Sequence, residues 1–137
     1  MKLLDQRDVG HILEKYGHLH DAYFKSVEVF PFNVIVEKVR FKLEAVKSID
    51  ESGWPHEDLL TIELREVREF RIEFETNSCF GPVFEATFGW NDGYVYVDFY
   101  GSSRSTQHPP WKDSPCYAVA RTLWWEAEDL PFIKDGS

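Results

Sequence analysis

The sequence predicts an α+β domain: a single antiparallel β-sheet with one face packed by an N-terminal and a C-terminal helix, and the other face polar. Three observations lead to this class. Apolar residues alternate with charged ones over long stretches, as in strands that bury one face. An Asp92-Gly93 pair separates two such stretches, and segments near both ends carry apolar residues at helical spacing. Because 137 residues are the size of one domain, we expect a single α+β domain over 1–137.

The first expected element is a helix from about Asp5 to Tyr16. Apolar residues recur there at the i, i+3, i+4 and i+7 positions of one helical face: Val9, Ile12, Leu13 and Tyr16. Gly17 follows at a position where helices commonly end, because glycine takes the left-handed conformation at little cost. We expect this apolar stripe to cover one face of the sheet.

Alternating patterns predict the strands. The first two run over 23–30 and about 34–46. A third alternating run spans 60–75 and is interrupted near Glu66, where we expect a bend or a turn between two strands. The polar residues 48–58 are expected to form a loop.

The Asp92-Gly93 pair predicts a two-residue type I′ turn, because both central positions need a positive φ. In the register that this turn sets, Trp90 faces Val95 and Phe88 faces Val97. The large apolar residues then share one face. The opposite face receives Glu85, Thr87, Gly89, Tyr94, Tyr96, Asp98 and Tyr100. An acidic and aromatic face of this kind is typical of docking surfaces.

A second helix is expected from about Pro115 to Asp129. Ser114 and Pro115 are the residue types that favour the N-cap and the first position of a helix. The inward stripe would contain Val119, Ala120, Leu123 and Ala127. Cys116 would lie in the first turn, where thiol pKa values fall, with His108 as a base; an inert buried cysteine is the simpler interpretation.

The formal net charge of −9 disfavours nucleic-acid binding, since phosphate contacts need clustered Lys and Arg. A basic protein partner is permitted, and solubility alone is the simpler explanation. No apolar run approaches the roughly 20 residues of a membrane span, and Asp5 comes too early for a signal peptide. With two cysteines in no metal spacing, we expect a cytoplasmic protein with free thiols and no cofactor.

A small metal site is the alternative chemistry. His18, His20 and Asp21 lie close together in the sequence, and His56 precedes two further acids. Imidazole and carboxylate groups are metal ligands, and two His at i and i+2 in an extended segment point the same way. A metal-dependent hydrolase is therefore one alternative, against a polar junction that bonds free backbone groups near the helix end. A structural homo-oligomer that pairs through a sheet edge is another.

Two short motifs resemble small bacterial α+β proteins that are grouped with the immunity proteins of polymorphic toxin systems. Leu19-His20-Asp21 follows the first helix, and Val67-Arg68-Glu69-Phe70 lies in the third alternating run. The resemblance implies a single-domain binder without a cofactor that neutralises a toxin domain. It supplies no catalytic residue.

We therefore expect a non-enzymatic protein-binding module that docks a basic partner through an acidic and aromatic surface, with homodimerisation left open. The candidate contact residues are Glu85, Tyr94, Tyr96, Asp98, Tyr100, Trp111 and Trp125. The alternative is that a third helix or loop covers this face and that the tyrosines belong to the rim of the core. Burial of Tyr94, Tyr96 and Tyr100 inside the domain would argue against the docking hypothesis.

Overall fold

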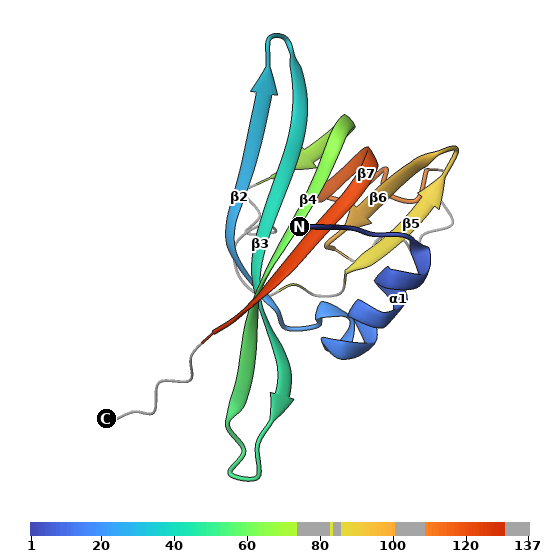
Figure 1. The fold of residues 1–137 in the computed structure, drawn as a ribbon. Helices are drawn as coiled ribbons and strands as arrows, with labels where there is room; N and C mark the ends of the chain where they lie inside the picture. Colours follow the sequence, from blue (N-terminus) through green and yellow to red (C-terminus); the bar gives the residue numbers. More distant parts are fainter. Residues whose placement is uncertain (74–82, 84–85, 101–108, 131–137) are drawn as a thin grey trace.

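A computed structural model describes residues 1–73, 83, 86–100 and 109–130. The strands are β1 (Lys2–Leu3), β2 (Tyr23–Phe32), β3 (Ile35–Ile49), β4 (Pro55–Ile72), β5 (Thr87–Asn91), β6 (Tyr94–Asp98) and β7 (Cys116–Asp129). They form one antiparallel sheet in the order β2-β3-β4-β7-β6-β5, and β1 pairs with β7 (Figure 1). Two long hairpins, β2–β3 and β3–β4, project from opposite ends of this sheet (Figure 1).

The helix α1 (Gln6–Lys15) lies where the sequence predicts a helix. Asp5 caps it: the Asp5 carboxylate accepts the N–H of Asp8 at 2.8 Å, and the Asp8 carboxylate accepts the N–H of Asp5 at 3.1 Å. A 3₁₀ turn, η1 (Gly17–Leu19), follows directly. Gly17 has a φ of 58°, which glycine adopts without steric cost.

The segment predicted as a C-terminal helix is instead β7, a central strand of the sheet. It pairs with β4 along nearly its whole length and with β6 over residues 117–120. Residues 116–120 are all buried, so no polar alternation marks them as a strand, and their apolar spacing also fits a helix. The expected two-helix packing was wrong: in the described residues one α-helix, α1, packs on one antiparallel sheet.

Ser114 does not cap a helix. Its hydroxyl accepts the N–H of Cys116 at 3.2 Å and donates to the Asp98 carboxylate at 2.6 Å. These bonds fix the entry of the chain into β7 beside the end of β6. Ser114 therefore does bond to the backbone at the start of a regular element, as a cap residue would, but that element is a strand and not a helix.

The predicted hairpin register is confirmed. Trp90 pairs with Val95 and Phe88 with Val97, and the turn residues Asp92 and Gly93 have φ values of 52° and 77°. The expected loop over 48–58 was wrong, because residues 55–58 pair with the end of β3 and extend the β3–β4 hairpin. The interruption near Glu66 is a bend within one strand, where Glu66 has a φ of 57°.

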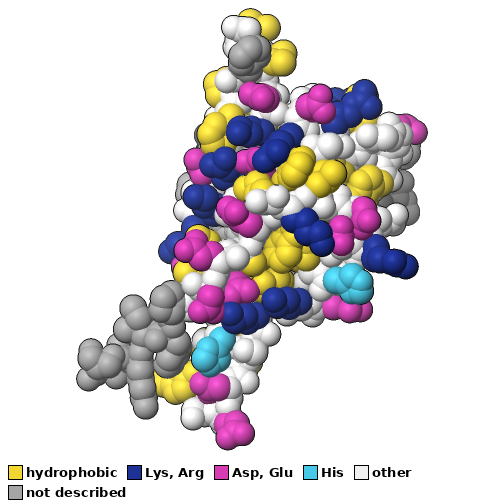
Figure 2. Space-filling model, viewed as in Figure 1, with side chains coloured by type: hydrophobic (Ala, Val, Ile, Leu, Met, Phe, Trp, Pro, Cys, Tyr) yellow, Lys and Arg dark blue, Asp and Glu magenta, His cyan; other side chains and the backbone are white. Residues whose placement is uncertain are grey.

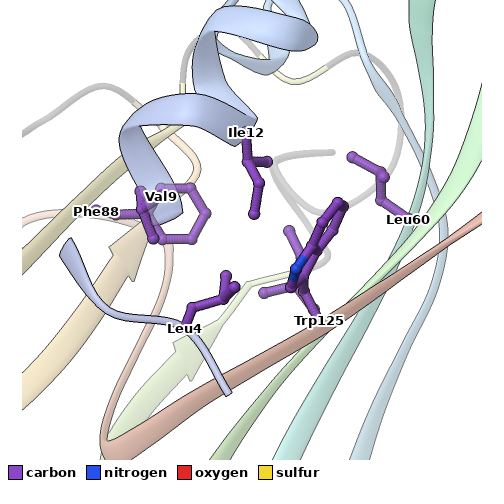
Figure 3. A pocket seen from close by; sticks show the side chains of 7 residues that line it. Leu4, Val9, Ile12, Leu60, Phe88 and Trp125 are labelled. Carbon is purple, nitrogen blue, oxygen red and sulfur yellow. The ribbon is translucent and has the colours of Figure 1, made fainter. Parts of the chain in front are cut away.

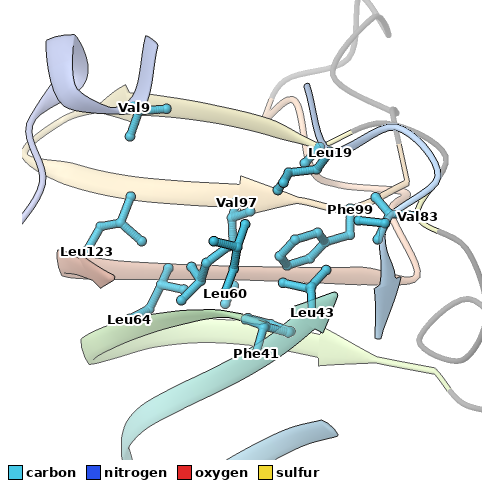
Figure 4. Packing of buried hydrophobic residues seen from close by; sticks show 14 of the residues in the cluster. Val9, Leu19, Phe41, Leu43, Leu60, Leu64, Val83, Val97, Phe99 and Leu123 are labelled. Atoms are coloured by element: carbon cyan, nitrogen blue, oxygen red, sulfur yellow. The ribbon is translucent and has the colours of Figure 1, made fainter. Parts of the chain in front are cut away.

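The core lies between the sheet and the α1–η1 segment (Figure 4). Large side chains from β3, β4, β6 and β7, and from the residue that follows β6, are fully buried there: Phe41, Leu43, Leu60, Leu64, Val97, Phe99 and Leu123. The Phe41 ring packs on Phe99 at a centroid distance of 4.7 Å, and Phe24 meets Phe99 at 5.1 Å. Leu19 of η1 is equally buried, so the turn after α1 closes the core.

Candidate functional site

The outer face of β6 and β7 is partly closed by a tryptophan. Trp111 is only 5% exposed, and its ring packs on Tyr96 at a centroid distance of 4.8 Å and on Tyr117 at 6.4 Å. The indole N–H of Trp111 and the hydroxyl of Tyr117 both donate to Glu69, at 3.2 and 3.0 Å. Trp111 therefore acts as a cover for this face and not as an exposed contact residue.

Tyr96 is held beneath that cover. A Cβ atom on Gly89 would lie 2.5 Å from Cε1 of Tyr96, so the tyrosine ring lies directly across the glycine on the neighbouring strand β5. Burial raises the pKa of Tyr96, and the charge of Asp98 raises it further. This tyrosine is thus a packed residue with restricted access to a partner.

The remaining predicted contact residues do not form one exposed patch. Asp98 is fully buried and accepts the N–H of Tyr100 at 2.9 Å as well as the Ser114 hydroxyl. Tyr94 is half-buried, whereas Tyr100 is 53% exposed. Glu85 lies outside the described residues.

Trp125 lies on the opposite, core side of the sheet. It lines a narrow apolar gap beneath α1 together with Leu4, Val9, Ile12, Leu60, Ile62 and Phe88 (Figure 3). The gap has a volume of about 10 Å³, which is no more than one water molecule requires. Trp125 is therefore a packing residue beside the core, and this gap has no room for a ligand.

The histidines predicted as metal ligands pair with separate carboxylates. His20 Nδ1 lies 3.0 Å from Asp21 Oδ2, and His56 Nε2 lies 3.2 Å from Asp50 Oδ2. In the described part of the chain, no three His, Cys, Asp or Glu side chains lie close enough together to hold a metal ion. His18, with a φ of 58°, belongs to the η1 turn.

The hypothesis of a reactive Cys116 required a helix N-terminus, which the structure does not place there. Cys116 is fully buried at the start of β7 and does not lie at a helix N-terminus. The interpretation as a buried cysteine fits this position. His108, the base considered with it, lies outside the described residues.

The most distinctive charged surface is the outer end of the β3–β4 hairpin with the facing end of β7. We call residues 46–57 and 126–129 the acidic arm. Lys47 is the one Lys or Arg in these two segments, against six carboxylates: Asp50, Glu51, Glu57, Glu126, Glu128 and Asp129. The two segments come together because residues 58–61 of β4 pair with residues 126–129 of β7.

The tip of the acidic arm is a well-ordered turn. The Asp50 carboxylate accepts the N–H groups of Trp54 and Ser52 at 3.0 and 2.9 Å, and Gly53 supplies a φ of 83°. The hydrogen bond from Trp54 is the main cause that lowers the pKa of Asp50, and His56 lowers it further. The tip is thus shaped before a partner arrives, which reduces the entropic cost of binding.

Lys47 neutralises only part of the arm. Its ammonium lies 2.7 Å from Asp58 Oδ1 and also contacts Asp129. Glu51 and Glu128 are exposed, and in the described residues neither lies within 4.0 Å of a cationic group. The arm therefore keeps a local negative charge that is available to a partner.

Apolar side chains are exposed beside these carboxylates. Ile49 is 68% exposed, Trp54 45% and Val46 40%. Large exposed apolar residues beside exposed charged groups are typical of surfaces that bind proteins. The acidic arm is accordingly the candidate functional site.

Seven of the described cations project from β3, β4 and β7, over the middle of the sheet and the end away from the acidic arm. They are Lys38, Arg40, Lys42, Arg65, Arg68, Arg71 and Arg121. In Figure 2, Lys and Arg side chains are spread over this face among acidic ones, whereas the projecting lower hairpin shows acidic, histidine and apolar side chains.

Comparison with models of protein families, with curated proteins and with solved structures finds no match. Within the described residues, no helix combines the length and the apolar character that crossing a membrane requires.

Sequence reasoning missed the acidic arm because it depended on the strand assignment of 116–129. The acids at 50–58 and at 126–129 are visible in the sequence. With the second group placed on a helix, nothing brought the two groups together. The signal that could have joined them is the β-branched and aromatic content of residues 117–125, which favours a strand.

Proposed function

We propose that the protein is a non-enzymatic protein-binding module whose acidic arm docks a basic surface of another protein. The observation that carries this proposal is the combination of six carboxylates and one lysine with three exposed apolar side chains in residues 46–57 and 126–129. Opposite charge accelerates the encounter of two proteins, and buried apolar contacts then slow their separation.

The shape of the arm supports the same role. The β3–β4 hairpin projects away from α1 and from the rest of the sheet (Figure 1). Its base is fixed by a buried hydrogen bond of 2.6 Å from the Tyr16 hydroxyl to Asp58 Oδ2. A projecting element with a fixed base presents its side chains at little conformational cost.

The test uses a display library of random peptides of about twelve residues, selected on the full-length protein at about 0.15 M salt, where charges are screened beyond about 8 Å. We expect the selected peptides to be rich in Lys and Arg with apolar residues between them. Synthetic copies should bind the Glu51→Lys/Glu128→Lys variant at least about tenfold more weakly, which corresponds to about 1.4 kcal/mol.

The matched control is Glu14→Lys/Asp113→Lys, which changes the net charge equally at two exposed sites outside the arm. We expect this variant to weaken binding less than about twofold. If the two variants weaken peptide binding equally, then only the net charge of the protein matters and the proposal is contradicted. Selected peptides without an excess of Lys and Arg would also contradict it. Unchanged unfolding midpoints confirm that both variants fold.

The finer proposal is that the basic partner is a toxin domain, as the resemblance of Leu19-His20-Asp21 and Val67–Phe70 to immunity proteins implies. It is tested by coexpressing this chain with a toxin module encoded beside its gene. We expect growth to be rescued by the wild-type chain and by the Glu14→Lys/Asp113→Lys control. Rescue that persists with Glu51→Lys/Glu128→Lys, or no rescue at all, would count against it.

A further inference from the structure

At the end of the sheet away from the acidic arm, β3 and β4 separate and leave a groove between them. The pairing of β3 with β4 stops at Lys38↔Arg65. Residues 35–37 of β3 and 66–72 of β4 therefore do not pair with each other. The separation coincides with the bend in β4 at Glu66. Figure 1 shows the β2–β3 hairpin projecting past the end of β4. Two strand edges thus face each other across an open space.

The walls of this groove combine apolar and charged side chains. Two adjoining hollows of about 380 and 330 Å³ share Ile35, Val36, Val67 and Arg68. The first hollow also contacts Val34 and Phe70, which are 99% and 37% exposed. Unpaired strand edges with apolar side chains are the features that bind an added strand from another chain.

One side of the groove ends in two arginines on a single tyrosine. The guanidinium groups of Arg68 from β4 and Arg121 from β7 lie 4.8 and 4.5 Å from the ring centroid of Tyr94. All three residues line the second hollow. Both guanidinium groups thus make cation–π contacts with the same aromatic ring.

These two arginines differ from the neighbouring arginines on the same strands and face. Arg40 and Arg65 share the buried Glu63, and Arg71 pairs with Glu73 at 3.8 Å. Among the described residues, neither Arg68 nor Arg121 has a carboxylate within 4.0 Å. In a chain of net charge −9, two exposed arginines without an acidic partner are an unusual local arrangement.

We propose that the groove between β3 and β4 binds an extended, acidic segment of a protein partner, whose carboxylate lies between Arg68 and Arg121. The backbone of that segment adds to a free strand edge, its apolar side chains pack on Val36 and Val67, and its acidic side chain accepts hydrogen bonds from the guanidinium groups. This site is independent of the acidic arm and lies at the other end of the sheet.

Three acidic residues restrict the register of the bound segment. Glu37 and Glu66 line the second hollow, and Glu69 lines the first. Their charges disfavour further acidic residues beside them, because like charges at close range repel. The preferred sequence therefore has acidic residues at one position facing Tyr94, with apolar or neutral residues on either side.

The experiment selects the same random peptide library on the full-length wild-type protein and then depletes the pool on the Arg68→Gln/Arg121→Gln variant. Peptides that survive depletion need the arginine pair. We expect Asp or Glu flanked by β-branched or aromatic residues in these peptides, and at least about tenfold weaker binding to the variant. Hydrogen exchange of residues 34–37 and 66–70 should slow when such a peptide binds.

Depletion on Arg7→Gln is the matched control, because Arg7 is an exposed arginine on α1 that also has no carboxylate within 4.0 Å among the described residues. A surviving pool that is empty, or no richer in Asp and Glu than the Arg7→Gln pool, overturns the inference. Acidic peptides that bind without slowing exchange at the two strand edges overturn the strand addition. The selection on the wild-type protein also recovers basic peptides that bind the acidic arm. The absence of acidic peptides would therefore count against the groove alone, and the absence of basic peptides against the proposed function alone.

Discussion

Replacing Glu63 by Gln removes the carboxylate that holds Arg40 and Arg65 together in the middle of the sheet. Glu63 is 1% exposed; Arg40 donates to its Oε1 at 2.9 and 2.8 Å, and Arg65 donates to its Oε2 at 2.6 Å. Hydrogen bonds to charged groups contribute about 1.5–3 kcal/mol each, and the amide of Gln retains only one acceptor. Because the arginines are 24% and 38% exposed, water screens their mutual repulsion. We expect the free energy of unfolding to fall by about 2–3 kcal/mol.

Urea unfolding followed by tryptophan fluorescence measures this loss. With a slope of about 1.5–2 kcal/mol per molar for a domain of this size, the midpoint should fall by about 1–2 M at pH 7. The control Glu73→Gln breaks an exposed pair with Arg71 and should change stability by less than about 0.5 kcal/mol. Equal midpoints for Glu63→Gln and the wild type would refute the argument.

The loss of stability in the Glu63→Gln variant should also depend on pH. Burial alone would raise the pKa of Glu63, but the hydrogen bonds from Arg65 and Arg40 outweigh it, so the folded pKa lies below its ordinary value. The carboxylate therefore stabilises the fold fully above the unfolded pKa of about 4.3, and this contribution disappears as the pH falls through the folded pKa. The difference between variant and wild type should be largest near pH 7 and shrink below about pH 4. A difference that stays constant in acid would contradict this account.

Three further substitutions test other points of the fold. Gly89→Ala places a Cβ atom against the ring of Tyr96, and we expect the free energy of unfolding in urea to fall by about 1–3 kcal/mol. Gly10→Ala meets no atom within 4 Å and should instead raise the free energy of unfolding by up to about 1 kcal/mol, because alanine favours the helix. If Gly89→Ala leaves the free energy of unfolding unchanged, then the Tyr96 ring is free to move away from Trp111. Tyr16→Phe removes the buried hydrogen bond to Asp58 and should cost about 1–3 kcal/mol by the same measurement. No change in its midpoint would show that Lys47 alone satisfies Asp58.

Local signals in the sequence predicted the elements whose conformation depends on local chemistry. The turn at Asp92-Gly93 and its register followed from the need for positive φ at both positions. The helix after Asp5 followed from its apolar spacing. In both cases neighbouring residues carry the information, so one short window of sequence is sufficient.

The C-terminal strand could not be predicted in the same way. Residues 116–120 are buried on both faces, between β4 and β6 and beneath Trp111, so their pattern has no exposed side. A short apolar run of this kind has no diagnostic period, and Ser114-Pro115 added a helix-like start. Only the pairing with β4 and β6, which lie far away in sequence, decides the conformation.

The candidate sites depend on that same long-range pairing. The acidic arm joins residues about 70 positions apart in the chain, through the pairing of Asp58 with Asp129. The arginine pair needs β4, β6 and β7 to bring Arg68, Tyr94 and Arg121 together. The acidic residues of the arm are visible in the sequence, but only the pairing of β4 with β7 shows that its two segments lie together.

Hydrogen exchange of the full-length protein, with and without the strongest selected basic peptide, tests most directly whether the acidic arm is the docking surface. The account predicts slower exchange in residues 46–57 and 126–129 and no change in α1. Slower exchange confined to other strands, with the acidic arm unaffected, would contradict it.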